Sequence, residues 1–177
     1  MKKILTIVCL LVLGVSTGFA QVHDGESAVG ANLVYGSEIK SLGVGIRYQY
    51  GFLDQLRGEI GFNYFFDHDH KSWCDVNVNA HWLLNVLNDQ FYIYPIVGFN
   101  YTMTKFKTKE HYEVDSETGE SIKIPARSEE KNHIGLNVGA GVEYELTEHW
   151  GVNFEYRHTI MRKVDQGVIG LGVNYKF

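Results

Sequence analysis

Seven charged side chains stand singly within otherwise apolar, alternating segments, and they are the first candidates for chemistry in this chain. Acidic side chains can transfer protons, but beside arginine they form ion pairs instead. Three of the seven are arginines and four are acids, which favours pairing with a structural role over catalysis. The seven residues are Arg47, Arg57, Glu59, Asp75, Glu143, Glu155 and Arg157.

Histidines supply the next candidate site. His68, Asp69 and His70, together with His111, have a spacing that permits a metal ion to bind. No second pair of ligands supports such a site, so a solvated polar loop is the stronger interpretation. We therefore predict no metal and no cofactor.

Strands must position these residues, because apolar side chains recur at every second position through most of the chain. Eight such segments are separated by turn residues, and a long polar stretch, Phe106 to Lys131, is predicted to be a loop. The segments cover about 28–35, 41–50, 56–66, 73–84, 91–105, 132–146, 150–160 and 169–177.

The two faces of these segments differ in a way that indicates a membrane. One face is nearly free of charge, and a Lys or Arg at mid-bilayer would cost about 2–4 kcal/mol. The other face carries Gly, Asn and the isolated charges, which suits a narrow interior better than the water-facing wall of a soluble lipocalin-like barrel. Aromatic residues gather at segment ends, as at the two membrane interfaces. We predict an all-β fold, an eight-stranded antiparallel up-and-down transmembrane β-barrel.

Inside such a barrel the seven charges should form one connected network. A turn centred near Leu53 would bring Arg47 and Arg57 face to face on neighbouring strands, with carboxylates required between them. Arg157 and Asp75 should complete the set toward the outer half of the lumen.

The 177 residues suit one domain, and a net charge of −5 argues against nucleic acid as a partner. Two lysines, a short apolar run and small residues before Ala20 predict a secretory signal peptide, 1–20, cleaved after Ala20. The predicted barrel domain is then 21–177. Cys74 would be its one cysteine, which excludes an internal disulfide.

The final forty or so residues resemble the small outer-membrane β-barrel family of Gram-negative bacteria, the OmpA/OmpX-like or porin-family barrel domain. The resembling stretches are Gly139–Tyr144, Leu146–Glu148, Phe154–Arg157 and Gly170–Phe177. The resemblance implies residence in the outer membrane, among its lipid and lipopolysaccharide. It also implies that the outer-membrane assembly machinery recognises the terminal Phe177.

We predict a structural or adhesive role without catalysis, with the 106–131 loop offering a site for an extracellular ligand. A narrow pore for small solutes is an alternative, because inward glycines could open a thin water path. A lipid A-modifying enzyme is a weaker one. A lipid A deacylase would need a His and a Ser two apart on an outward face, but Ile160 follows His158 at that spacing.

Overall fold

The computed structural model describes residues 25–68, 71–87, 90–108, 111–114, 121–124, 127–162 and 165–177. Where residues 67–72 and 105–130 are described, the description covers the backbone only. The predicted signal peptide therefore lies outside the described residues, as do Asp69 and His70 of the candidate metal site.

The regular elements of the described chain are strands. They are β1 (Ser27–Gly36), β2 (Ser41–Leu53), β3 (Leu56–His68), β4 (Lys71–Trp82), β5 (Leu84–Leu87), β6 (Phe91–Thr108), β7 (His111–Val114), β8 (Ser121–Ile124), β9 (Arg127–Glu145), β10 (Trp150–Met161) and β11 (Gln166–Lys176). The described part of the chain contains no helix long and apolar enough to cross a membrane.

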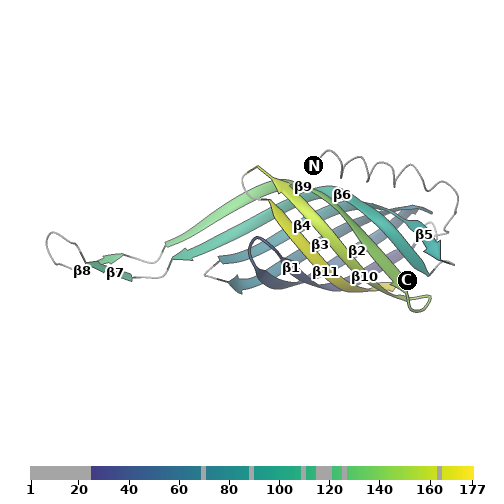
Figure 1. The fold of residues 1–177 in the computed structure, drawn as a ribbon, viewed down its shortest axis with the longest axis horizontal. Helices are drawn as coiled ribbons and strands as arrows, with labels where there is room; N and C mark the ends of the chain where they lie inside the picture. Colours follow the sequence, from purple (N-terminus) through teal and green to yellow (C-terminus); the bar gives the residue numbers. More distant parts are fainter. Residues whose placement is uncertain are drawn as a thin grey trace.

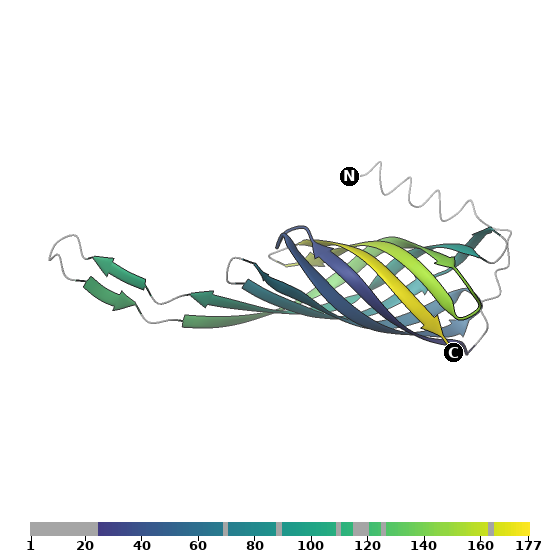
Figure 2. The ribbon, with the colours of Figure 1, turned by 90° about the horizontal axis from the view of Figure 1, so that it is seen from below.

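Eight of these strands close into a ring. The order is β4-β3-β2-β1-β11-β10-β9-β6, and pairing between β6 and β4 completes the circle. Every pairing is antiparallel, and the first strand, β1, closes against the last, β11. Figures 1 and 2 show the tilted strands of the resulting tube. The predicted eight-stranded antiparallel barrel is confirmed.

A proline lies beside the break between β4 and β5. β5 continues β4 along the same edge of β6, but the two are separated at Leu83. The flanking pairs are His81 with Ile96 and Leu84 with Ile93, so the break lies beside Pro95. Proline has no N–H to give to a ladder. The Leu83 amide instead donates to the Gln55 carbonyl, 2.7 Å away in the neighbouring turn.

The wall alternates between an apolar outside and a filled inside. Along β2 from Ser41 to Tyr50, buried and exposed residues alternate without exception. The exposed set is almost wholly apolar, with Ile46 at 66% and Leu33 at 62% exposure. A soluble protein rarely exposes a contiguous apolar surface of this extent, whereas lipid requires one.

Aromatic side chains mark both ends of this wall. We call the end that carries Phe177 and the turns at 54–55 and 146–149 the C-terminal rim. Here Trp150 packs on Tyr175, with ring centroids 5.0 Å apart. We call the opposite end, where β6 and β9 leave the barrel, the hairpin rim. Aromatic side chains at the two interfaces are typical of membrane barrels.

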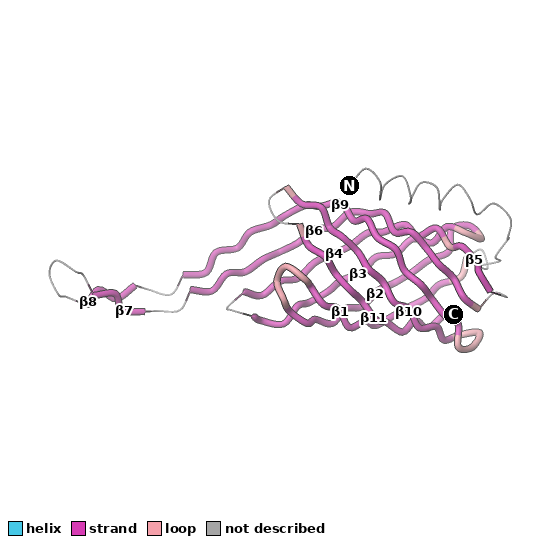
Figure 3. Tube along the Cα trace, in the orientation of Figure 1, coloured by secondary structure: helices cyan, strands magenta, loops and turns pink. Residues whose placement is uncertain are grey.

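The predicted loop from Phe106 to Lys131 is largely strand, which corrects the sequence interpretation. β6 and β9 stay paired as far as Thr108 and Arg127, and β7 and β8 form a further antiparallel pair. Figure 3 shows these strands running well past the hairpin rim. Polar composition suggested a loop, but cross-strand backbone hydrogen bonds hold this segment in register regardless of side-chain polarity.

Candidate functional site

The barrel interior gathers all seven charged residues singled out from the sequence. Each lies on the inward face of its strand and is between 1% and 6% exposed. Burial at this level requires that every charge be compensated, because an isolated ion in a low-dielectric interior is strongly unfavourable. The ion pairs and hydrogen bonds of each charged side chain determine whether this requirement is met.

Arg47 on β2 is the centre of the first cluster. Its Nη1 atom lies 2.6 Å from Glu155 Oε1 and 3.2 Å from Glu59 Oε2. Its Nη2 atom donates to the amide oxygen of Asn153 at 3.1 Å. A Cβ on Gly172 would stand 2.9 Å from that nitrogen, so glycine leaves room for the guanidinium.

Arg57 on β3 is the centre of the second cluster. Its Nη1 atom lies 2.9 Å from Glu143 Oε2, and its guanidinium carbon stands 5.1 Å from the centroid of the Tyr94 ring. The Tyr94 hydroxyl donates to Glu155 Oε1 at 2.8 Å, which joins this cluster to the Arg47 cluster. His81 stacks on Tyr94, with ring centroids 4.9 Å apart.

The expectation that Arg47 and Arg57 face each other is wrong. The turn between β2 and β3 is Asp54–Gln55, with a register shift between Gly51 and Leu53. Arg47 is therefore opposite Gly61, and Arg57 is opposite Gly51. This register places the Glu59–Gln49 pair between the two arginines. The intervening carboxylate removes the like-charge contact that the predicted register would have created.

Asp75 and Arg157 are both buried, but the structure does not bring them into an ion pair. Asp75 Oδ1 accepts hydrogen bonds from the amides of Asn63 and Asn77, at 2.7 and 2.5 Å. Within the described residues, no carboxylate oxygen forms an ion pair with Arg157. Asp75 thus accepts these hydrogen bonds from neutral amides and forms no ion pair with Arg157.

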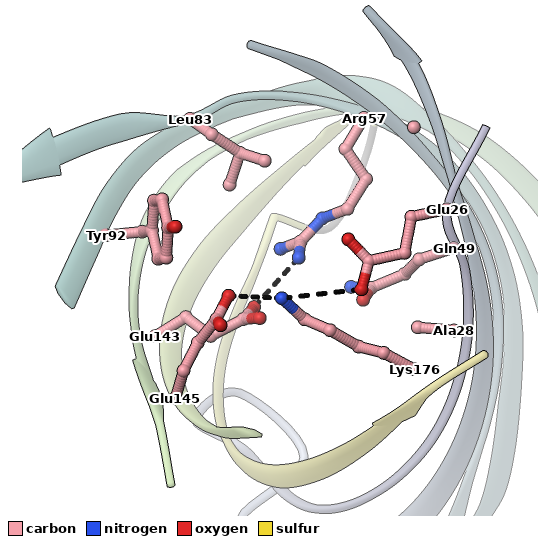
Figure 4. Close-up of a pocket in the computed structure, with 10 residues that line it drawn as sticks. Glu26, Ala28, Gln49, Arg57, Leu83, Tyr92, Glu143, Glu145 and Lys176 are labelled. Carbon is pink, nitrogen blue, oxygen red and sulfur yellow. Dashed lines mark hydrogen bonds and ion pairs between the residues drawn. The ribbon is translucent and has the colours of Figure 1, made fainter. Parts of the chain in front are cut away.

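Sequence reasoning missed Lys176, the residue that balances the buried charge. Its ammonium is bound to Glu145 and lies 3.8 Å from Glu26 Oε1 (Figure 4). With Lys176, and histidine aside, the buried side chains of the described chain comprise four cations and four carboxylates. The signal was present in the sequence, since Lys176 shares the inward parity of Asn174 and Gly172.

Amides fill the lumen between the ionic clusters and the hairpin rim. Asn137 is fully buried and donates to Asn77 Oδ1 at 2.9 Å and Asn79 Oδ1 at 2.8 Å, while Thr159 donates to Asn137 at 2.7 Å. Apolar side chains then close the hairpin-rim end of the lumen. They are Val34, Phe65, Trp73, Met161 and Val168, with Ile39 against them.

The cavity at the C-terminal rim is small. It has a volume of about 20 Å³, enough for about one water molecule, and is lined by Arg57, Glu143, Glu145 and Lys176 among others (Figure 4). A solute would have to displace these paired charges to pass. The lumen is therefore built as a packed polar core.

The remaining candidates lie outside this core. His158 is half-buried on the outward face of β10, and Ile160 follows it on the same face at 49% exposure. Among the described residues, no group of three His, Cys, Asp or Glu side chains is placed to hold a metal ion. Phe177 exchanges backbone hydrogen bonds with Ser27 at 2.8 and 3.2 Å, and its ring points outward with 65% exposure.

Known proteins are similar to this chain in sequence and in fold. Outer membrane protein X of Escherichia coli K12 is 28% identical over 141 residues, covering 76% of this chain and 74% of the relative. The N-terminal β-barrel domain of Pseudomonas aeruginosa OprF superposes with a TM-score of 0.66 at 14% identity, covering 87% of this chain and 98% of that one. Ail, the attachment invasion locus protein of Yersinia pestis, superposes with a TM-score of 0.58 at 20% identity. The match covers 88% of this chain and 100% of that one.

The match to a family extends over nearly the whole sequence. Residues 7–177 fit the outer membrane protein beta-barrel domain family. The closed antiparallel ring, the apolar wall and the polar lumen agree with that match. The chain accordingly belongs to the outer membrane protein β-barrel domain family.

Proposed function

We propose that this protein holds a protruding strand pair above the outer membrane, where the pair contacts a partner surface, and that it has no catalytic step. The observation that carries this proposal is the continuation of β6 and β9 beyond the barrel wall. The barrel is the anchor, and its closed, charge-balanced lumen gives that anchor rigidity.

The strand pair offers an open edge. β10 pairs with β9 only between Gly135 and Glu145, so the ladder between these two strands stops before residues 127–134 of β9. On the other side, β4 follows β6 as far as Phe106, which leaves a much shorter edge. An unpaired edge presents backbone N–H and C=O groups to an incoming strand, and β-strand addition is a common mode of peptide recognition.

Orientation follows from the lengths of the connections. The turn at 54–55 and the turn at 146–149 are short and lie at the C-terminal rim, whereas the β6–β9 extension leaves from the other end. Membrane barrels of this kind keep short turns in the periplasm and long loops outside. We therefore assign the hairpin rim to the cell surface and both chain termini to the periplasm.

Protease added to intact cells should cut first within residues 106–131, because β7 and β8 in that segment lie beyond the hairpin rim (Figure 3). The fragments, sized by mass spectrometry, should end in this range and leave the barrel strands intact. Cleavage confined to the turns at 54–55 or 146–149 of intact cells would reverse the assigned orientation.

A shortened variant tests the adhesive role directly. Joining Phe106 to Glu129, which are register partners, through an Asn-Gly turn removes the extension and keeps the ring. Cells that display this variant should lose attachment to uncoated and collagen-coated polystyrene, while the protein still shows heat-modifiable migration on gels. The matched control is Arg162→Ala, an exposed residue at the same rim. Equal attachment by the shortened variant and the control would refute the adhesive role.

The filled lumen argues against the alternative of a pore. Ion pairs, a buried amide network and an apolar cluster follow one another along the axis. In planar bilayers, purified protein should produce no stepwise ionic conductance above that of the protein-free membrane. Regular, reproducible conductance steps would show that the lumen opens and would favour the pore instead.

A further inference from the structure

Lys176 occupies a position where three chain segments meet. It lies at the end of β11, the last strand, and is 9% exposed. Its ammonium reaches Glu145 at the end of β9, two strands away in the ring, and Glu26 just before β1. Figure 4 shows both carboxylates approaching the ammonium from opposite sides of the lumen.

These two contacts depend on different stages of barrel formation. β9, β10 and β11 are consecutive in the ring, so Lys176 can reach Glu145 in an open sheet. Glu26 directly precedes β1 and Lys176 ends β11, and they meet only when β1 pairs with β11. The contact with Glu26 therefore exists only in the closed barrel.

The backbones of β1 and β11 also pair with each other beside this site. Lys176 is the register partner of Ala28, and Phe177 exchanges two hydrogen bonds with Ser27. The Glu26 carbonyl accepts from the Gly51 amide at 2.9 Å, which fixes Glu26 over the lumen. The ammonium of Lys176 thus lies beside the junction of β1 and β11, where the backbones of the two strands are paired in register.

We propose that Lys176 is the electrostatic latch of the barrel seam. In the open sheet its charge is matched by Glu145 alone. Closure adds Glu26 as a second carboxylate, 3.8 Å from the ammonium. The latch favours correct pairing of the first and last strands, because only the closed seam gives the ammonium of Lys176 its second carboxylate.

The test compares four variants during folding from urea into detergent micelles, with the closed form measured by its heat-modifiable migration. Lys176→Met should slow closure and lower the temperature midpoint of the migration shift by about 5 °C or more. Lys176→Arg should stay close to the wild type because it keeps the charge. Glu26→Gln should reproduce part of the loss, and Lys40→Met, in an exposed turn at the other rim, should have no effect.

The double variant Lys176→Met with Glu26→Gln supplies the decisive comparison. If the latch exists, the two losses are non-additive, and the double variant is no worse than Lys176→Met alone. If Lys176→Met does not fold at all, the comparison passes to Glu26→Gln and Lys176→Arg. A Glu26→Gln protein that closes as fast and melts as high as the wild type overturns the proposal, as does strict additivity in the double variant.

Discussion

Replacing Arg47 with Met should destabilise the barrel by about 3–5 kcal/mol, because it removes the cation that pairs with both Glu59 and Glu155. Methionine keeps the apolar stem of the side chain but lacks the guanidinium. The two carboxylates, however, would remain buried without their partner. Urea unfolding in phosphocholine vesicles, followed by tryptophan fluorescence, measures the free energy of unfolding.

Arg162→Met is the matched control for this prediction, since Arg162 is an exposed arginine at the hairpin rim. Its free energy of unfolding should change by less than about 0.5 kcal/mol, as for other surface substitutions. An Arg47→Met protein whose stability matches that of the control would mean that the lumen charges are solvated by water rather than by each other.

Placing an arginine at position 46 should cost about 2–4 kcal/mol in a bilayer, because Ile46 stands at the middle of the lipid-facing wall with 66% exposure. Ile46 is flanked in register by Ala31 on β1 and Phe62 on β3, both also outward, so an arginine there would have no carboxylate to meet. The measurement is again the free energy of unfolding in vesicles.

Leu53→Arg is the companion to this substitution. Leu53 has a similar exposure of 57% but lies at the end of β2, beside the turn at the C-terminal rim. Arginine near the interface costs only about 0–1 kcal/mol. Equal losses of unfolding free energy at positions 46 and 53 would mean that the cost of an outward arginine does not depend on its depth in the membrane. That result would contradict the membrane placement of the barrel.

The strand pattern could be predicted because membrane barrels impose strict alternation. Each wall residue faces either lipid or lumen, so a period of 2 in the sequence translates directly into faces, as along β2. The ring of eight followed from counting such segments. The inward position of all seven charged residues followed from the same parity.

Contacts inside the lumen could not be predicted from parity, because they depend on register. The turn at Asp54–Gln55 shifts β3 relative to the expectation and moves Glu59 between two arginines. Lys176 was overlooked because its partners, Glu26 and Glu145, lie near strand ends. The alternating sequence pattern shows which way a side chain points, but not which side chains at the strand ends lie close together. The strands within 106–131 were missed because this segment is mostly polar. The apolar alternation in β7 and β8 covers only two positions in each strand, which is too short to indicate a strand.

The extension of β9 beyond the wall also determines the electrostatic environment at the far end of the strand pair. From Ile134, the last strongly lipid-exposed residue of β9, to Arg127 there are seven residue steps, or about 23 Å along the strand. The Debye length at physiological ionic strength is about 8 Å. A partner that pairs with the far end of this edge therefore approaches beyond the reach of the charges on the membrane surface, and its attraction or repulsion depends on the strand pair alone.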